Sequence, residues 1–312
     1  MIAGVWAVIV NWNGGSQNLD CLRSLVGQGI DPARIVLIDN ASTDGSPAAV
    51  AAEFPAVTLL RNAENQGYGH GTNRGIRHAL AAGAETVFLV NNDLTLASGA
   101  LAALFAALAA APGAGIVGPR IVLRRDPGTI WCAGGLVTWR QNLSTMIGHG
   151  RSDGPVYRAT REVDYVPGCA MLVRRAVFER VGLLDGDYFA YHEDVELCVK
   201  AKEAGFAVLV AGAALAHHDA HHSTGGGYNP RRKYMMGANT VWFLKKHGTP
   251  LRWLSFLLFD VFSLPFVLLR RAPRGEGAAV LAKARGMLDA ARGRRVTEES
   301  LRGWTNGSRG EG

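Results

Sequence analysis

Three short polar clusters stand directly behind apolar runs in the first hundred residues. Carboxylates at such places can accept hydrogen bonds from a base or a ribose, or hold a hard divalent cation that bridges two phosphates. A single aspartate there is more often an ordinary turn or helix-capping residue, so the clusters are informative together. They are Asn11-Trp12-Asn13, Asp39-Asn40-Ala41-Ser42-Thr43-Asp44 and Asn91-Asn92-Asp93.

An acid pair and a histidine cluster stand further along the chain. Glu193 and Asp194 begin a predicted helix over 192–204. Acids in a first turn are favoured by the helix dipole alone, whereas in a cleft Asp194 can take a proton from an acceptor hydroxyl. If the histidines were helical, their i,i+4 pairs could bind zinc, but the Ser-Thr-Gly-Gly-Gly that follows favours a loop in which one histidine completes a cation site. They are His217, His218, His221 and His222.

Alternating apolar strands and helices must position these groups. Helical periodicity and cap or stop residues predict helices around Leu19–Val26, Asp44–Phe54, Asn73–Ala82 and Ser98–Ala111. This alternation predicts an α/β fold, a mostly parallel Rossmann-like sheet flanked by helices, with ligands at the carboxyl ends of the strands. The predicted strands are Val5–Val10, Ile35–Ile38, Val57–Leu60, Val87–Val90 and Ile116–Val122.

The glycine patterns exclude two enzyme classes. The turn after the first strand reads NWNGGSQ, not GxGxxG, and the glycines of 67–71 lack the spacing of a dinucleotide site. No P-loop lysine motif occurs either. Hydride transfer to a dinucleotide and P-loop ATP hydrolysis are therefore not expected.

Composition and cysteine usage limit the classes of protein to which this chain can belong. Of 312 residues, 48% are hydrophobic and 19% charged, which excludes a disordered chain and a disulfide-stapled mini-protein. The four cysteines form no CxxC pair, which fits a reducing compartment. The apolar start MIAGVWAVIVNW lacks a basic flank and a cleavage site, so we expect a buried strand and a cytoplasmic protein.

The positive charge belongs to the last quarter of the chain. Residues 1–230 hold 17 Lys and Arg against 20 Asp and Glu, while 231–312 hold 16 against 6. The tail also contains the apolar run 251–269, interrupted by Arg252, Asp260 and Pro265 and followed by further arginines up to residue 274. We expect a helix lying in the plane of an anionic membrane over 251–274, with burial in a homodimer or against the main domain as an equal alternative. No nucleic-acid partner is expected, because no basic–aromatic module is present.

Together these segments resemble a family 2 glycosyltransferase of the GT-A fold, in particular the bacterial rhamnosyltransferase-like branch. The resemblance implies a GT-A nucleotide-sugar glycosyltransferase domain over 1–230 and a basic, amphipathic helical C-terminal region over 231–312. Six segments carry it, in the order of the family: VIVNWNG, IVLIDNASTDGS, NAENQGYGHGTNRGI, FLVNND, VPGCAMLVRRAVFERVGLLDGDYFAYHEDVELC and HHDAHHSTGG.

The resemblance also implies roles for single residues. Asp194 would be the catalytic base, with Glu193 as its polar neighbour, and Asp39 would read the base of the nucleotide. Asp93 and His218 would hold Mg²⁺ or Mn²⁺; Asn91 stands where the family's metal motif often has its first acid. The remaining nucleotide-sugar-binding residues would be Asn11, Asn13, Asn40, Asn65, Gly67, Asn73, Asn91 and Asn92.

The implied reaction is an inverting transfer from a nucleotide-diphospho sugar to a hydroxyl of a glycan or polyprenyl-linked acceptor in cell-surface polysaccharide synthesis. dTDP-L-rhamnose is the donor that the branch suggests, followed by a UDP-sugar, and the enzyme would be peripheral on the inner face of the membrane. Two alternatives stay open. A sugar-phosphate nucleotidyltransferase would carry a basic glycine-rich loop after its first strand, and a non-catalytic glycan-binding protein would not need the acids.

Overall fold

The computed structural model describes residues 4–140, 142–219 and 228–304. The chain forms two compact units. Unit 1 comprises Met1–Val137, Met146–Gly186 and Glu193–Ala220, and unit 2 comprises Thr138–Thr145, Asp187–His192 and His221–Gly312. Two short segments before residue 230 therefore pack with the C-terminal helices, a division that differs from a simple boundary at that residue.

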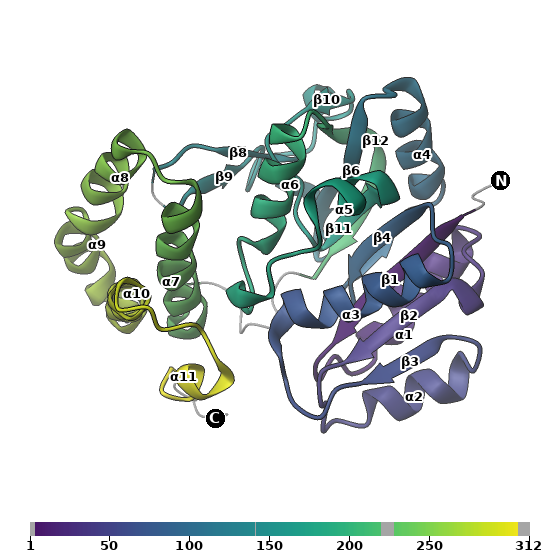
Figure 1. The fold of residues 1–312 in the computed structure, drawn as a ribbon, viewed down its shortest axis with the longest axis horizontal. Coiled ribbons are helices and arrows are strands. Elements are labelled where there is room, and N and C mark those ends of the chain that lie inside the picture. The colour runs from purple at the N-terminus through teal and green to yellow at the C-terminus, as the bar shows by residue number, and fades with distance from the viewer. Residues whose placement is uncertain (1–3, 141, 220–227, 305–312) are drawn as a thin grey trace. The chain divides into compact units, whose positions relative to one another are not determined.

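Unit 1 is built on one mixed sheet with the strand order β10-β12-β6-β11-β4-β1-β2-β3 (Figure 1). Parallel pairing joins β3, β2, β1 and β4, and also β6 and β12; β11 is antiparallel to both of its neighbours. The strands of this order, by position in the chain, are β1 (Val5–Asn11), β2 (Ile35–Asp39), β3 (Thr58–Arg61), β4 (Thr86–Asn91), β6 (Ala114–Leu123), β10 (Arg161–Glu162), β11 (Ala170–Arg174) and β12 (Ala207–His218).

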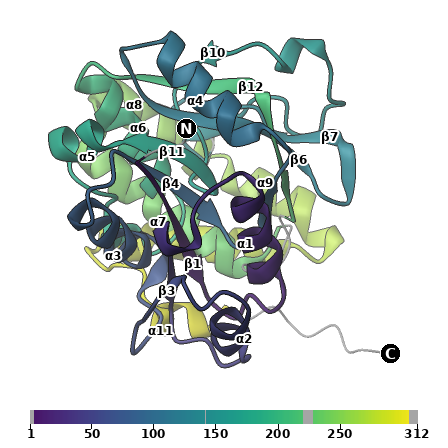
Figure 2. The same cartoon turned by 90° about the vertical axis from the view of Figure 1, so that its right-hand side faces the viewer.

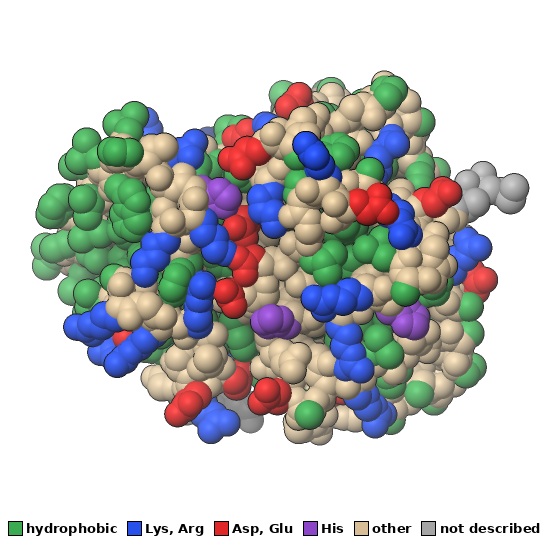
Figure 3. All heavy atoms as spheres, in the orientation of Figure 1, with side chains coloured by type: hydrophobic (Ala, Val, Ile, Leu, Met, Phe, Trp, Pro, Cys, Tyr) green, Lys and Arg blue, Asp and Glu red, His purple; other side chains and the backbone are tan. Residues whose placement is uncertain are grey.

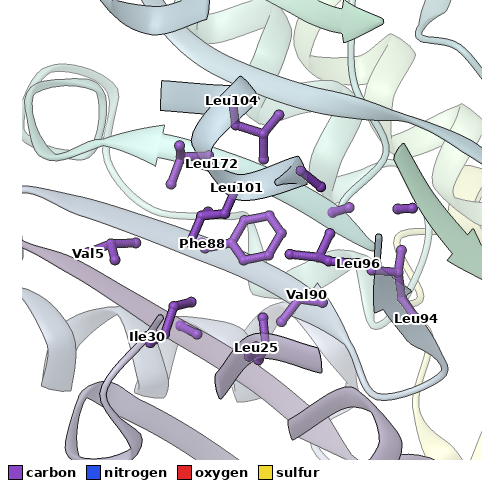
Figure 4. Close-up of a cluster of buried hydrophobic side chains, with 14 of the residues drawn as sticks. Val5, Leu25, Ile30, Phe88, Val90, Leu94, Leu96, Leu101, Leu104 and Leu172 are labelled. Carbon is purple, nitrogen blue, oxygen red and sulfur yellow. The ribbon is translucent and has the colours of Figure 1, made fainter. Parts of the chain in front are cut away.

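Helices cover both faces of this sheet because its strands alternate their side chains. Val5, Ala7 and Ile9 of β1 lie in one core with residues of α1 and α4, and Figure 4 shows Val5 of this core with Leu25 and Leu101. Val8 faces Gly75 of α3, and Figure 2 shows α3 and α1 on opposite sides of β1. An added Cβ at Gly75 would lie 2.3 Å from Val8 Cγ1, so the residue must be small there. The helices of unit 1 are α1 (Gln17–Gly27), α2 (Ser46–Glu53), α3 (Gly67–Ala81), α4 (Ala100–Ala110), α5 (Arg175–Val181) and α6 (Glu193–Glu203).

The predicted α/β architecture is confirmed, and the differences have local causes. All five predicted strands form, but β11 was not predicted; its antiparallel insertion separates β4 from β6. Helix α3 begins at Gly67, six residues before the predicted start, because its glycines allow close packing: a Cβ on Gly69 would lie 3.1 Å from the Asp185 carbonyl oxygen. Helix α2 begins at Ser46, whose N–H is accepted by Asp44 at 3.0 Å.

Four further short strands complete the described sheets. Strand β5 (Leu94–Leu96) pairs with β12, and β7 (Asp126–Cys132) pairs with β6. Strands β8 (Gly135–Val137) and β9 (Ser144–Met146) form a separate two-stranded sheet. The loop between β8 and β9 supplies the segment Thr138–Thr145 of unit 2.

Unit 2 is helical and has its own apolar core. Tyr234, Val241 and Leu244 of α7 pack in it with Ala282 and Met287 of α10. Its helices are α7 (Pro230–His247), α8 (Pro250–Phe256), α9 (Leu264–Arg271), α10 (Gly277–Ala291) and α11 (Glu298–Arg302).

The stretch from α8 to α9 has one polar and one apolar side. Ser255 donates to the Trp139 carbonyl at 2.6 Å, and the buried Asp260 forms an ion pair with Lys283 of α10. The opposite side leaves eight large apolar residues 40–76% exposed: Leu251, Leu254, Leu257, Leu258, Phe259, Phe262, Phe266 and Leu269.

A π-helical turn at Leu257–Val261 joins α8 to α9. Such a turn changes the angular step between residues, and Phe256 is buried whereas Phe259 is exposed. Among the described residues, the one helical stretch long and apolar enough to cross a membrane by length and composition is Pro250–Arg274, and 11% of its most apolar window is buried.

Candidate functional site

The carboxyl ends of β1 and β2 are joined by the side chain of Asn11. In the register of these strands Asn11 pairs with Asp39, and the Asn11 amide nitrogen donates to Asp39 Oδ1 at 3.2 Å. The same nitrogen lies 3.1 Å from Ser42 Oγ and 2.9 Å from Ser46 Oγ. Its Oδ1 accepts from Gly14 N, Asn18 Nδ2 and Asn92 Nδ2 at 2.9–3.3 Å.

These contacts indicate different roles for Asn11 and Asp39. Asn11 is completely buried, and its amide is occupied by other residues of the chain, so it positions its neighbours. Asp39 accepts from Asn11 and from the Ser42 N–H, both at Oδ1. Within the described residues no donor reaches its second oxygen, which keeps its capacity for a ligand.

The other residues predicted for nucleotide binding lie on the loops and the helix that surround this strand edge. Asn13 has a left-handed backbone, and its Oδ1 accepts the Thr43 N–H at 2.7 Å. Asn40 donates to the Gly67 carbonyl at 3.0 Å, where α3 begins, and Asn65 accepts the Gly67 N–H at 3.0 Å. These contacts tie the 39–44 loop to its neighbours.

Asn73 lies in the middle of α3 and not at the start of the predicted helix. Its amide nitrogen donates to the Leu184 carbonyl at 2.7 Å, and its oxygen accepts the Leu184 N–H at 3.1 Å. The side chain is buried and binds α3 to the segment that follows α5. Asn73 therefore holds two elements of unit 1 together.

Asp93 and His218 are brought together from distant parts of the chain. Asp93 directly follows the Asn91-Asn92 pair behind β4, His218 ends β12, and Asp93 Oδ1 lies 3.1 Å from His218 Nε2. Both side chains are buried, and the Trp131 ring packs edge-on against the imidazole at 4.4 Å between centroids. His217 and His218 belong to β12, so the loop expected for the histidine cluster is wrong at this end, as is the helical alternative. His221 and His222 lie outside the described residues.

This pair fits a hard divalent cation as a partial ligand set. One carboxylate and one imidazole are suitable donors, and two adjacent ligands of an octahedral ion lie about 3 Å apart. Among the described residues no group of three or more His, Cys, Asp and Glu side chains could hold a metal. The remaining positions around such an ion would fall to water and to a ligand.

The acid pair begins α6, where Glu193 is buried and Asp194 is half-buried. Asp194 Oδ2 accepts the Gly168 N–H and its Oδ1 accepts the Val195 N–H, both at 2.8 Å. Burial nevertheless raises the pKa of Asp194. Burial, followed by the charge of Asp194, raises the pKa of Glu193 well above its usual range, and the Glu193 Oε2 atom has no partner among the described residues. A carboxylate held by two N–H groups and poised to accept a proton suits a general base.

The segment Gly168-Cys169, for which the sequence motifs predicted no role, connects α3, the acid pair and the end of β4. The carbonyl of Gly168 accepts from the Tyr68 hydroxyl of α3 at 2.8 Å, and its N–H binds Asp194. The carbonyl of Cys169 accepts the Asn91 N–H at 2.9 Å. Burial first, and then the charges of Asp93 and Asp194 among others, raise the pKa of the Cys169 thiol. The glycine in VPGCAM was the feature of the sequence that could have indicated this close contact. A Cβ at Gly168 would lie 3.2 Å from Asp194 Cβ, so a small residue is favoured there.

Comparisons with known proteins agree with this geometry. The model of the family described as "Glycosyltransferase like family 2" matches residues 3–234. The N-acetylglucosaminyl-diphospho-decaprenol L-rhamnosyltransferase of Mycobacterium tuberculosis is 32% identical over 247 residues, 71% of this chain and 79% of the relative. The dTDP-rhamnosyl transferase RfbF of Shigella flexneri is 24% identical over 258 residues, 80% of this chain and 83% of the relative.

Solved structures give the same fold. The mannosyltransferase PcManGT from Pyrobaculum calidifontis, in complex with GDP-Man and Mn²⁺, superposes with a TM-score of 0.60 at 18% identity, covering 92% of this chain and 87% of that one. TarS 1–349 of S. aureus, in complex with UDP-GlcNAc, gives 0.53 at 14% identity and covers 93% and 92%. The predicted GT-A fold is confirmed.

We predict that Asn11→Asp destabilises unit 1 by about 1–3 kcal/mol, because it replaces the amide donor with an acceptor and leaves two carboxylates in contact. Asn13→Asp is the matched control: its Oδ1 can still accept the Thr43 N–H, so its effect should stay within about 0.5 kcal/mol. Urea unfolding of both variants measures the difference. Equal effects would contradict the positioning role of Asn11.

We also predict a pH-dependent gain in stability from Glu193→Gln. Because the pKa of Glu193 is raised in the native state, the wild-type free energy of unfolding falls as the pH rises above the unfolded value of about 4.3, until the native pKa is passed. The glutamine variant lacks this loss, so it should become the more stable protein between about pH 5 and 8. Urea unfolding across that range tests this, with the exposed Glu203→Gln on the same helix as control. A constant difference at every pH would be the contrary result.

Proposed function

Because the chain belongs to the glycosyltransferase like family 2, in which its relatives include rhamnosyltransferases, we propose that it is an inverting transferase that moves L-rhamnose from dTDP-L-rhamnose to a lipid-linked acceptor. A UDP-sugar is the second candidate donor. The observation that carries the proposal is Asp194, a half-buried carboxylate held by two backbone N–H groups, one of which is that of Gly168. The carbonyl of the next residue, Cys169, accepts the Asn91 N–H at the end of β4.

The donor would bind across the carboxyl ends of β1, β2 and β4. Asp39 would accept a hydrogen bond from the nucleotide through its second oxygen, while Asn11 holds the Asp39 carboxylate in place. Asn13, Asn40 and Asn65 keep the surrounding loops in register, and Asn91 and Asn92 lead from β4 to Asp93. Rhamnose as the sugar is inferred from the names of the relatives, because the structural neighbours carry other sugar nucleotides.

Asp93 and His218 would hold Mg²⁺ or Mn²⁺ through a carboxylate oxygen and an imidazole nitrogen. When bound, such a cation neutralises the negative charge that grows on the leaving diphosphate. Trp131 packs against the His218 ring and limits its rotation. The complexes of two neighbouring folds with Mn²⁺ support this choice of ion.

Asp194 would accept the proton of the acceptor hydroxyl as that oxygen attacks the anomeric carbon. The new carbon–oxygen bond forms on the face opposite the bond to the diphosphate, which breaks with its electron pair leaving on the nucleotide. A single displacement inverts the anomeric configuration, and the raised pKa of Asp194 makes it a stronger base than an exposed aspartate. Glu193 would remain protonated beside it and add no second negative charge.

The acceptor would be a sugar on a polyprenyl diphosphate at the inner face of the membrane, as cell-surface polysaccharide synthesis requires. The name of the mycobacterial relative and the exposed apolar side of α8 and α9 support this part of the proposal. The match to a glycosyltransferase family over residues 3–234 decides against the nucleotidyltransferase alternative. It also disfavours a glycan-binding protein without activity.

We expect Asp194→Asn to lower turnover by about 10²–10⁴-fold while donor binding persists, because the amide cannot accept the proton. The measurement is release of nucleoside diphosphate in the presence of acceptor, with Glu203→Gln as the control on the same helix. Full activity of the Asp194 variant would remove this residue from the role of base.

We expect one nucleoside diphosphate among dTDP, UDP, GDP and CDP to raise the melting temperature by several degrees in a Mn²⁺-dependent way. A ligand at 100 times its dissociation constant adds about 2.7 kcal/mol to the free energy of unfolding. In His218→Gln the Mn²⁺-dependent part of the shift should disappear, while any shift with nucleotide alone remains. An unchanged Mn²⁺ effect in that variant would exclude His218 as a ligand.

A further inference from the structure

Unit 2 contains a cationic cavity that the transfer reaction does not use. It has a volume of about 360 Å³ and is lined by residues of α7, α9, α10, the π-helical turn and the 138–145 segment. Four of the lining side chains are basic and one is acidic. They are Lys233, Arg270, Arg271, Lys283 and Asp260.

The negative charge of Asp260, the one acid among the lining residues, is already neutralised by an ion pair. Asp260 forms its ion pair with Lys283 and accepts the Asn142 N–H at 3.2 Å, and Lys283 also donates to Asn142 Oδ1 at 2.9 Å. Arg271 pairs with Glu276 at 2.8 Å. For Lys233 and Arg270 the described residues provide no ion pair, so the cavity keeps an excess of positive charge.

An aromatic ring holds two of these cations close together. Lys233 Nζ lies 4.3 Å and the Arg271 guanidinium carbon 4.5 Å from the centre of the Tyr228 ring. Burial, followed by the like charges of Lys283, Arg232 and Arg271, lowers the pKa of Lys233 to about 7. A bound anion would relieve this repulsion, and ammonium and guanidinium groups are the side chains that bind phosphate most strongly.

Helix α9 connects this cavity to the exposed apolar face. Leu264, Val267 and Arg271 of α9 line the cavity, whereas Phe266 and Leu269 of the same helix are exposed. Figure 3 shows the hydrophobic side chains gathered over α8 and α9, with Lys and Arg side chains along the border of the patch. A phosphate in the cavity and a hydrocarbon chain on the apolar face would thus be separated by about one helix diameter, roughly 10 Å.

We infer that this cavity binds the terminal phosphate or diphosphate of a membrane lipid whose hydrocarbon chain lies against the exposed face of α8 and α9. The charge of the cavity selects a phosphorylated headgroup, and the adjoining apolar face selects a lipid over a soluble phosphate. This site goes beyond the proposed function, because the diphosphate of the proposed acceptor lies between its sugar and its lipid and is not terminal. Its binding is measured without donor, so the two proposals can fail separately.

The test uses the full chain and sedimentation with three kinds of vesicle. They are phosphatidylcholine alone, phosphatidylcholine with phosphatidic acid, and phosphatidylcholine with phosphatidylserine at the same surface charge. We expect binding to the phosphatidic acid vesicles to be about tenfold tighter than to those with phosphatidylserine, because only phosphatidic acid has a terminal phosphate. Equal binding to the two anionic vesicles, or binding to none, would overturn the inference.

Two variants separate the cavity from the apolar face. Lys233→Gln with Arg271→Gln should abolish the tenfold preference, while Arg292→Gln with Arg302→Gln, which removes two basic side chains outside the lining residues, should keep it. Phe262→Ser with Phe266→Ser should abolish vesicle binding but keep a thermal shift with inorganic pyrophosphate. Circular dichroism melting confirms that each variant is folded.

Three further outcomes would overturn the inference. The first is a cavity variant that keeps the preference for phosphatidic acid. The second is a pyrophosphate shift in wild-type protein that binds no vesicles, because the source is then a soluble phosphate. The third is a stable dimer that buries the apolar face and excludes vesicles.

Discussion

The amide of Asn11 is the interaction on which the candidate site depends. The nitrogen of this buried amide lies within hydrogen-bond distance of Asp39, Ser42 and Ser46, and its oxygen accepts from the backbone of Gly14 and from two other amides. Buried polar groups without partners cost about 1–3 kcal/mol each, so this network is stable only as a complete set. Gly14 belongs to it for the same reason: a Cβ there would lie 2.0 Å from Asn92 Nδ2. The loop that presents Asp39 is thereby fixed before any ligand arrives.

In unit 2 a buried asparagine also holds a loop in place, here through hydrogen bonds to backbone carbonyl groups. Phe189, Tyr191 and His192 have left-handed φ values, which are unfavourable for large side chains, and they immediately precede the acid pair of α6 in the chain. The Asn239 amide nitrogen lies 2.7–2.9 Å from the carbonyl oxygens of Tyr188, Ala190 and Tyr191 and holds this strained segment. Both units thus use a buried asparagine to fix a loop that regular secondary structure does not stabilise.

Much of the fold could be predicted from the sequence, because strands such as Val87–Val90 and helices such as α4 are marked by local apolar patterns. The pairing of Asp93 with His218 followed from a resemblance to a family and not from spacing, since 125 residues separate them. The start of α3 at Gly67 could not be predicted: its glycines lower helix propensity, and the tertiary contacts that require them are invisible in the sequence. For the same reason the role of Gly168, which joins Tyr68 to Asp194, appeared only in three dimensions.

The buried pair of Asp260 and Lys283 has a consequence for the order of synthesis. Lys283 follows Asp260 by 23 residues, so the apolar stretch of α8 and α9 leaves the ribosome while its acid still lacks its cation. At that stage the stretch combines the length of a membrane span with an acid that lacks its cation. Only after α10 emerges can the acid be neutralised and the polar side of the helix be covered. The nascent chain therefore passes through a period in which this apolar segment lacks the contacts that α10 later supplies.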